Sequence, residues 1–295
     1  MATSSKRVIF ALVVTCLFTI FVNCLQSDFT EVPEVQESSN IGEQTNVQLE
    51  ENNEIAQTAA SSVESDIDDP DKICVDCIFS LGIACRPSGY LRDFNLRFQA
   101  APLDWMSSYS LDTAAYLFET KFSDFFAEIE EVSGKTDAGY RSVNDTKNHI
   151  SSIHHFKNDA PLLEEQKRFR EKMLNRANKV DEILKNSSSI AFICDRSKAT
   201  PEELISFLTR FDKIYPNKKI ILINIKNSNI QDIKKDVLFE NDNLKIIQFS
   251  FNDQPSSGDS SDAWKGNKEI WSTIIKPISL SGKFVNSSTD SKIEF

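Results

Sequence analysis

Cysteine is scarce in this chain, which has six cysteines among 295 residues. Two of them, Cys16 and Cys24, fall in an apolar N-terminal segment. The other four are too few to build a disulfide-scaffolded fold of this size, although they could form one bridge. The chain must therefore fold around a hydrophobic core, and its 40% hydrophobic residues suffice for one large domain or two small ones. These four cysteines are Cys74, Cys77, Cys85 and Cys194.

Several common motifs are also missing. The sequence has no GxGxxG, Walker A, HExxH or GxSxG pattern, so it lacks the usual signatures for dinucleotides, P-loop nucleotides, zinc peptidases and serine hydrolases. The Cys74-x-x-Cys77 pair has neither a second pair nor histidines at zinc-binding spacing. A strand pattern follows it, whereas a redox pair requires a helix start. We interpret the two residues as buried thiols or one incidental disulfide, and we expect no metal and no cofactor.

A surplus of basic charge is absent as well. The net charge is −11, but residues 27–72 alone hold 13 acidic residues against one lysine. Residues 73–295 carry 31 acidic and 30 basic residues, so this part gives no electrostatic footprint for nucleic acid. The acidic stretch 27–72 has almost no aromatic residues and cannot bury enough apolar area to offset its ordering entropy. We predict that it is a disordered linker.

The N-terminus has the layout of a targeting segment. Lys6 and Arg7 precede the apolar run "VIFALVVTCLFTIFV", which predicts a secretory signal peptide over residues 1–26. The apolar run over 8–25 is also about as long as a minimal membrane-spanning helix, so an uncleaved membrane anchor remains open. Either reading places the domain in the secretory route, secreted or anchored outside the cytosol. Three glycosylation sequons fit that location, at Asn144, Asn186 and Asn286.

The first half of the predicted domain, which spans 73–282 before a polar tail at 283–295, mixes strands and helices. The patterns predict a buried strand in "CIFSLGIA", a helix in "RPSGYLRDFNL" and a longer helix from Leu111 to Ile129 at the 3.6-residue period. A loop is expected over 134–148 and a strand in "ISSIHHF". A long helix should follow, with Asp159 as its cap and Pro161 just inside its start.

The second half alternates strand and helix. Strands are predicted in "SSIAFIC", "KKIILINI" and "LKIIQFSF", with helices over 200–215 and 230–239 and a final helix over 263–278. Thr200 and Glu203 form a capping box at the first of these helices. The alternation predicts an α/β fold with a mostly parallel sheet flanked by helices in three layers, Rossmann-like in its C-terminal half.

Cys85 is the first candidate for chemistry. It follows the predicted strand at a helix start, where backbone N–H groups and the helix dipole favour a thiolate. The domain has three histidines that could act as its base, His149, His154 and His155, and two of them end a predicted strand. A thiol paired with His154, or alternatively with His155, would be a catalytic pair. A free cysteine that only fills space is the competing interpretation.

Three further elements could complete a site. Asp104 could orient the histidine or grip substrate with Trp105 as an aromatic wall, or it could merely cap the next helix while Trp105 fills the core. Asp195 follows the strand "SIAFIC", and the carboxyl ends of parallel strands are where ligands bind in open α/β sheets. The loop 252–262, which leads to Trp264, comes to the same edge. The basic run over 167–176 is interpreted as a solvated helix face.

The segment "SLGIACRPSGYLRDFNLRFQAAPLDWMSSYSLD" resembles the opening motif of the putative papain-like cysteine peptidases. In that motif a cysteine follows Ser-Leu-Gly by three residues, and a Pro-Phe-Asp-Trp element comes later, here "PLDW" with Leu103 in place of phenylalanine. "ISSIHHF" is similar to the family's histidine segment, with His154 in the motif position. Looser similarities are an arginine-bearing helix and "WKGNKEIW" near the end.

The resemblance, which covers roughly residues 75–276, implies a thiol hydrolase without a cofactor that acts on a peptide or small-molecule amide or ester. It implies Cys85 as nucleophile and His154 as base, with Asp104 and then Asp195 as candidates for a third member. Two alternatives stay open. One is a Rossmann-like sugar- or nucleotide-binding transferase that grips its ligand with Arg86, Asp104 and Asp195, and the other is a non-catalytic secreted binding protein.

Overall fold

The computed structural model describes residues 72–135, 139–255 and 260–284. The predicted signal or anchor segment, the acidic linker up to residue 71 and the Asn286 sequon lie outside the described residues, as does all but the start of the polar tail. Within the described part of the chain, no helix is both long and apolar enough to span a membrane.

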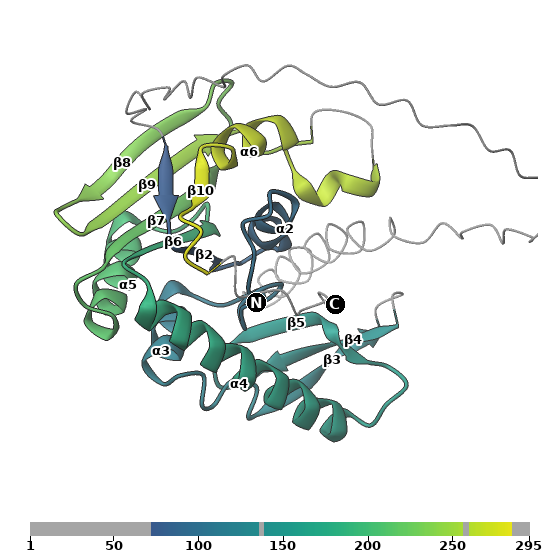
Figure 1. Ribbon diagram of the computed structural model, residues 1–295. Coiled ribbons are helices and arrows are strands. Elements are labelled where there is room, and N and C mark those ends of the chain that lie inside the picture. The colour runs from purple at the N-terminus through teal and green to yellow at the C-terminus, as the bar shows by residue number, and fades with distance from the viewer. Residues whose placement is uncertain (1–71, 136–138, 256–259, 285–295) are drawn as a thin grey trace, which may run out of the picture. The chain divides into compact units, whose positions relative to one another are not determined.

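A five-stranded sheet forms the centre of the fold (Figure 1). Its order is β2 (Cys77–Ser80), β6 (Ser189–Asp195), β7 (Lys219–Asn227), β9 (Leu244–Phe251) and β8 (Lys234–Glu240). Every neighbouring pair is parallel except β8 with β9. The prediction of an α/β fold with a mostly parallel sheet is therefore confirmed. A separate parallel pair joins β1 (Ile73–Val75) to β10 (Ile278–Leu280).

Alternation along the strands gives this sheet two apolar faces. One face, with Phe79, Phe192 and Leu222 in register, packs against α3 (Leu111–Glu119), α4 (Leu162–Asn186) and α5 (Pro201–Ile214). The other, with Ile78 and Ile193, packs against α2 (Cys85–Asp93) and α6 (Lys268–Ile275). Each fully buried side chain of this kind contributes about 1.5–3 kcal/mol, so the two faces hold the three layers together.

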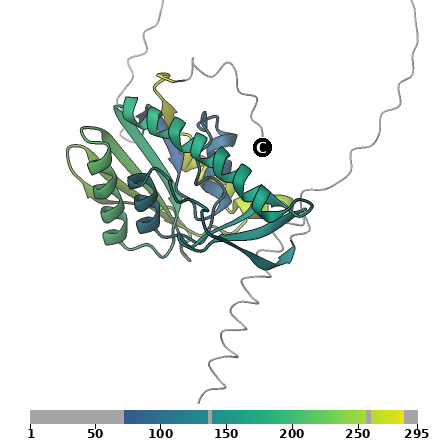
Figure 2. The ribbon, with the colours of Figure 1, turned by 90° about the horizontal axis from the view of Figure 1, so that it is seen from below.

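A second sheet lies beside the first and is wholly antiparallel, in the order β3 (Ile129–Lys135), β4 (Tyr140–Asp145), β5 (Ile150–Lys157). The 25-residue helix α4 crosses both sheets (Figure 2). Near its start, Phe169 packs on Phe156 of β5 at 4.8 Å between ring centroids. Near its end, Asp181 accepts a hydrogen bond from Tyr215, just after α5. The helix thereby fixes β5 relative to the main sheet.

The predictions for the strands at β2, β5, β6, β7 and β9 are confirmed, as are those for helices at α2, α4 and α5. The capping box of α5 forms as expected, with the Thr200 hydroxyl accepting from the Glu203 N–H and the Glu203 carboxylate accepting from the Thr200 N–H. The Asp159 cap is wrong, because α4 begins at Leu162 after Pro161, with no side-chain cap.

The predicted helix from Leu111 to Ile129 is wrong in its second half, since α3 ends at Glu119. Lys121, Phe122 and Phe126 have positive φ values of 52° to 58°, which turn the chain. The phenylalanines were spaced like a helical stripe, but they fill the core from successive turns, with Phe122 and Phe125 edge to face at 5.6 Å. The free energy gained by burying these aromatic rings here outweighs the helical preference that their spacing indicates.

Three other predictions also fail. The loop expected over 134–148 contains all of β4 and the end of β3, and the helix expected over 230–239 is replaced by edge strand β8. The final helix is divided into η1 (Ser260–Lys265) and α6, because Gly266 has φ +66° and a side chain there would collide with Asp253. In each case contacts between distant segments decided the local structure.

Gly82 carries the chain from β2 toward α2 with φ +65°, and a Cβ there would lie 2.5 Å from the Tyr109 hydroxyl and 3.1 Å from the Met106 carbonyl oxygen. We therefore expect Gly82→Ala to destabilise the protein more than Gly282→Ala, whose φ is +83° but which has open space around it. Backbone strain alone should cost about 1–2 kcal/mol at Gly282, and overpacking should add about 1–3 kcal/mol at Gly82. Urea denaturation of the full chain measures both, and equal losses would contradict the prediction.

Candidate active site

Cys85 is the first residue of α2, directly after Ala84, whose extended backbone makes Ala84 the N-cap. No side chain caps this helix end. The first N–H groups of a helix have no partner within the helix, and together with the helix dipole they favour an anion. Pro87 stands in the first turn, where the lack of an N–H costs nothing. The predicted junction between a strand and a helix is therefore present, with the thiol at its start.

His154 approaches this thiol from the second sheet. Its Nε2 atom lies 3.8 Å from the Cys85 Sγ atom, within reach of a weak sulfur–nitrogen hydrogen bond. The two residues are 69 positions apart and belong to different elements, α2 and β5. Catalytic hydrogen bonds are often long before substrate binds, so this separation suits a pair that tightens later.

His155 points to the other side of β5. Its Nδ1 atom is 2.9 Å from the Ser152 hydroxyl, and its ring lies 5.2 Å from that of Phe169 on α4. Burial lowers the pKa of His155 to about 3, with the neighbouring His154 adding to the effect, so the ring is neutral near pH 7. These contacts give His155 a packing environment, whereas the contact with the Cys85 sulfur belongs to His154.

The other thiols differ from Cys85. Cys77 and Cys194 are buried, and burial raises the pKa of each to about 12. Cys74 is exposed, and none of the four cysteines in the described residues forms a disulfide. Of the Cys74-x-x-Cys77 pair, then, only Cys77 is the buried thiol that we expected. The described ranges also contain no cluster of three or more His, Cys, Asp or Glu side chains suited to a metal ion.

Asp104 is buried, with 2% of its surface exposed, and its carboxylate binds within its own neighbourhood. Oδ1 accepts from the Ser88 hydroxyl at 3.0 Å, and Oδ2 accepts from Arg97 Nε and the Ala101 N–H, each at 2.8 Å. Ser88 lies on α2, three residues after Cys85. The described contacts of Asp104 thus lead to the helix that carries the thiol.

Two tryptophans lie against the same face of α2. The Trp264 ring occupies the space beside Gly89, where a Cβ would come within 2.7 Å of it, and Gly89 is one helical turn from Cys85. Trp105 lies 6.4 Å from Trp264 between ring centroids, at an interplanar angle of 57°. The Arg92 guanidinium stands 5.6 Å from the Trp105 ring. Both rings are half-buried, which places an aromatic surface one turn from the sulfur.

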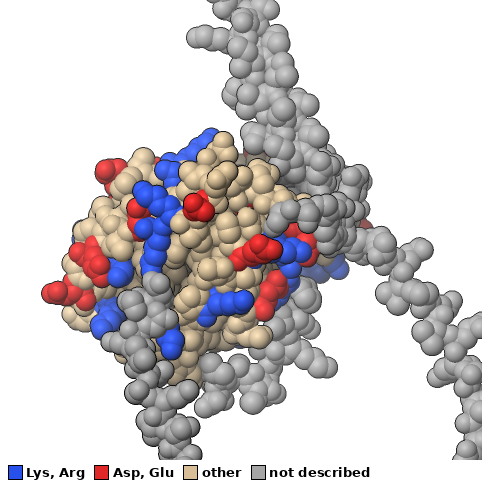
Figure 3. All heavy atoms as spheres, turned by 90° about the horizontal axis from the view of Figure 1, so that it is seen from above, with Lys and Arg blue, Asp and Glu red and all other residues tan. Residues whose placement is uncertain are grey.

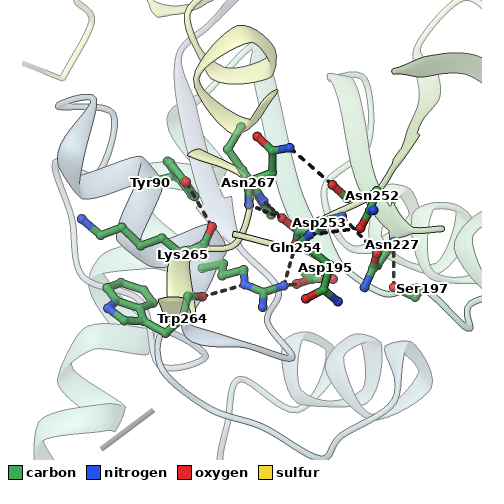
Figure 4. Close-up of polar contacts among 12 residues, drawn as sticks. Tyr90, Asp195, Ser197, Asn227, Asn252, Asp253, Gln254, Trp264, Lys265 and Asn267 are labelled. Carbon is green, nitrogen blue, oxygen red and sulfur yellow. Dashed lines mark hydrogen bonds and ion pairs between the residues drawn. The ribbon is translucent and has the colours of Figure 1, made fainter. Parts of the chain in front are cut away.

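Arg86 ties the first turn of α2 to Asp195 and Asp253, which Figure 4 labels at the carboxyl ends of β6 and β9. Its Nε donates to the Trp264 carbonyl oxygen at 2.6 Å, and its Nη1 donates to Asp253 at 2.6 Å and to Asp195 at 3.4 Å. Asp253, whose side chain is fully buried, also accepts from the Trp271 indole N–H and the Asn267 N–H. The expected convergence at this edge is present between Asp195 and the described start of the 252–262 loop, where Asp253 lies.

Asp253 and Ser88 are the residues that sequence reasoning missed. Asp253 follows β9 as Asp195 ends β6, so its position after a buried strand was a usable signal. Ser88 gave no such signal, because a serine in the first turns of a helix is common and its partner lies 16 residues away.

Acidic and basic side chains are interspersed over the face of the domain in Figure 3, and neither sign covers it.

The family described as "Putative papain-like cysteine peptidase (DUF1796)" matches residues 76–227. The match spans just over half of the chain and includes Cys85, Asp104, His154 and Asp195, so the chain belongs to this family. Asp253 lies beyond the matched region. No curated protein and no solved structure matches the chain.

The buried carboxyl of Asp195, 10% exposed, generates a prediction about pH. Burial raises its pKa from 3.8 to about 6; Arg86 opposes the rise and Asp253 reinforces it. Because the pKa is raised in the folded state, Asp195 disfavours folding only when ionised: this cost is absent below about pH 4 and complete above about pH 7. Relative to the parent, Asp195→Asn should therefore gain up to about 3 kcal/mol of unfolding free energy as the pH rises over that range. Denaturant titrations of both proteins test this, and a difference that does not vary with pH would contradict it.

Proposed function

We propose that this protein is a thiol hydrolase in which Cys85 is the nucleophile and His154 the general base and acid. The observation that carries the proposal is the 3.8 Å approach of the Cys85 sulfur to His154 Nε2 at the N-terminus of α2, in a chain of the family described as "Putative papain-like cysteine peptidase". The substrate would be an amide or ester of a peptide or small molecule.

In the first half of the reaction, His154 accepts the thiol proton, and the Cys85 thiolate attacks the substrate carbonyl carbon to form a C–S bond. The carbonyl π electrons move to oxygen, and the resulting oxyanion accepts hydrogen bonds from the backbone N–H groups of Cys85 and Arg86. The tetrahedral intermediate then expels the amine or alcohol, which takes the proton from His154. The products of this half are a thioester on Cys85 and the leaving group.

In the second half, water replaces the leaving group. His154 removes a proton from the water as it attacks the thioester carbon, and a second oxyanion forms at the same position. Collapse of this intermediate breaks the C–S bond and releases the carboxylic acid. His154 and Cys85 then share the proton as they did at the start, so the cycle needs no cofactor.

The surroundings of the sulfur support substrate binding beside it. Trp105, which the sequence offered as an aromatic wall, would contact the substrate together with Trp264, and Arg86 would contribute a cation nearby. We also propose that the parallel strands β6, β7 and β9 make the C-terminal half of the fold Rossmann-like. We further propose that the enzyme acts in the secretory route, either secreted or held at a membrane by residues 8–25.

The sequence also allowed a transferase or a non-catalytic binding protein. The thiol–imidazole contact favours the hydrolase over both, because neither alternative needs a sulfur at a helix N-terminus within reach of a histidine. The transferase would instead rely on Arg86, Asp104 and Asp195. Each of these already makes hydrogen bonds to protein groups.

The experiment is alkylation of the full chain with iodoacetamide at pH 6, followed by peptide mass spectrometry. Cys85 should react at least about tenfold faster than Cys74, the exposed thiol of the same chain, because a thiolate paired with an imidazolium persists at low pH. His154→Gln should remove this advantage, and hydrolysis of amide or ester substrates should be lost in Cys85→Ser.

Two matched controls are available in the other histidines. His155→Gln and His149→Gln, the latter at an exposed position, should leave the reactivity of Cys85 close to that of the parent. Equal rates for Cys85 and Cys74 in the parent, or a loss of reactivity in His155→Gln and not in His154→Gln, would overturn the proposed pair.

A further inference from the structure

The segment over residues 101–107, here called the Asp104 loop, contacts both elements of the thiol–imidazole pair. It contains Asp104 and Trp105 and ends at Ser107. Three of its side chains are buried in the main core and anchor the loop there: Ala101, Leu103 and Met106. Its polar contacts leave in two directions, one toward α2 and one toward β5.

The contact with α2 is made through a buried hydrogen bond. The Ser88 hydroxyl, fully buried, donates to Asp104 Oδ1 at 3.0 Å, and Ser88 is three residues after Cys85 and thus on the same side of the helix. Trp105 reinforces this contact, because its ring lies beside Gly89 and under Arg92 on that side of α2. The loop therefore constrains the position of α2, and its rotation about the helix axis, at the turn that follows Cys85.

The contact with β5 is made through the backbone. The Ser107 N–H donates to the Ser151 carbonyl oxygen at 3.1 Å, and the Ser151 N–H donates back to the Ser107 carbonyl oxygen at 2.9 Å. Ser151 precedes His154 by three residues on the same strand. The loop thus adds a short antiparallel bridge to the strand that carries the imidazole.

The carboxylate of Asp104 also holds the loop in its own shape. It accepts from the Ala101 N–H at the loop's start and from Arg97, a mostly buried side chain before it. The buried Asp104 carboxylate therefore stabilises the shape of the loop and also binds the loop to α2. Removal of this carboxylate would weaken both the loop conformation and the contact with α2.

We propose that Asp104 is a positioning residue that sets the separation of Cys85 and His154 through Ser88 on one side and the Ser107–Ser151 bridge on the other. This assignment rests on the proposed hydrolase function. It differs from the role that the family resemblance implied for Asp104 as first candidate for a third member, in which the carboxylate would orient the imidazole directly. The two roles make opposite predictions for Ser88, because only the positioning role depends on its hydroxyl.

The test measures the rate of Cys85 alkylation between pH 5 and pH 8 in four full-length variants, with Cys74 as internal reference. The variants are Ser88→Ala, Asp104→Asn, the double variant, and Ser187→Ala as a matched control. Ser187 is also buried and hydrogen-bonded, but it is the C-cap of α4, just before β6 begins and away from the site. Thermal unfolding midpoints are recorded alongside, so that a loss of stability is separated from a loss of reactivity.

Ser88→Ala should lower the Cys85 rate at pH 6 about tenfold or more, since a displacement of about 1 Å can cost that much in a reacting pair. The Cys74 rate should not change, and Ser187→Ala should lower the midpoint without slowing Cys85. The double variant should be no slower than Asp104→Asn, because both changes break the same contact.

A parent-like Cys85 rate in Ser88→Ala would overturn the positioning role. If Asp104→Asn is slow in that case, Asp104 acts on the imidazole itself. Failure of the proposed function looks different, because Cys85 would then already react like Cys74 in the parent and His154→Gln would change nothing. That outcome overturns both proposals together.

Discussion

The ion pair between Arg86 and Asp253 is the interaction on which the site depends. It joins the first turn of α2 to the end of β9, and Asp253 extends the connection to α6 through Trp271. Because the Asp253 side chain is fully buried, removing its cationic partner would leave an uncompensated charge, which costs about 3–5 kcal/mol in comparable pairs. The position of the thiol is thus determined by residues that come more than 160 positions later in the chain.

The site also joins two sheets of different kinds. The main sheet and its ion pair fix the helix that carries the sulfur, while the antiparallel sheet supplies the imidazole. Phe169 of α4 packs against the antiparallel sheet, and the last turns of the same helix pack beside α5. The single long helix α4 therefore fixes the main sheet and the antiparallel sheet relative to each other. The Asp104 loop sets the separation of the two sheets locally at the site.

Much of this could be predicted from the sequence. Local patterns predict the buried strands, the capping box of α5 and the placement of Cys85 at a strand–helix junction. These features could be predicted because interactions between residues close in the sequence determine them. The failures share another cause. Phe122, Phe125 and Phe126 were spaced like a helix but pack from turns, and the polar stretch before His149 pairs as a hairpin. The pairing of Arg86 with Asp253 joins residues 167 positions apart, and no spacing rule reveals such a contact.

The order of the elements along the chain has one more consequence. The region that matches the family ends at residue 227, the last residue of β7, and after both members of the thiol–imidazole pair. The strand β9, Asp253, Trp264 and α6 come later. A recombinant fragment that stops at the family boundary would retain Cys85 and His154, but Arg86 would lose its buried counterion Asp253. The apolar face of the sheet that α6 covers beside α2 would become exposed to solvent. For expression and crystallisation, the boundary of the folding unit therefore lies beyond β10, some fifty residues past the boundary that sequence matching defines.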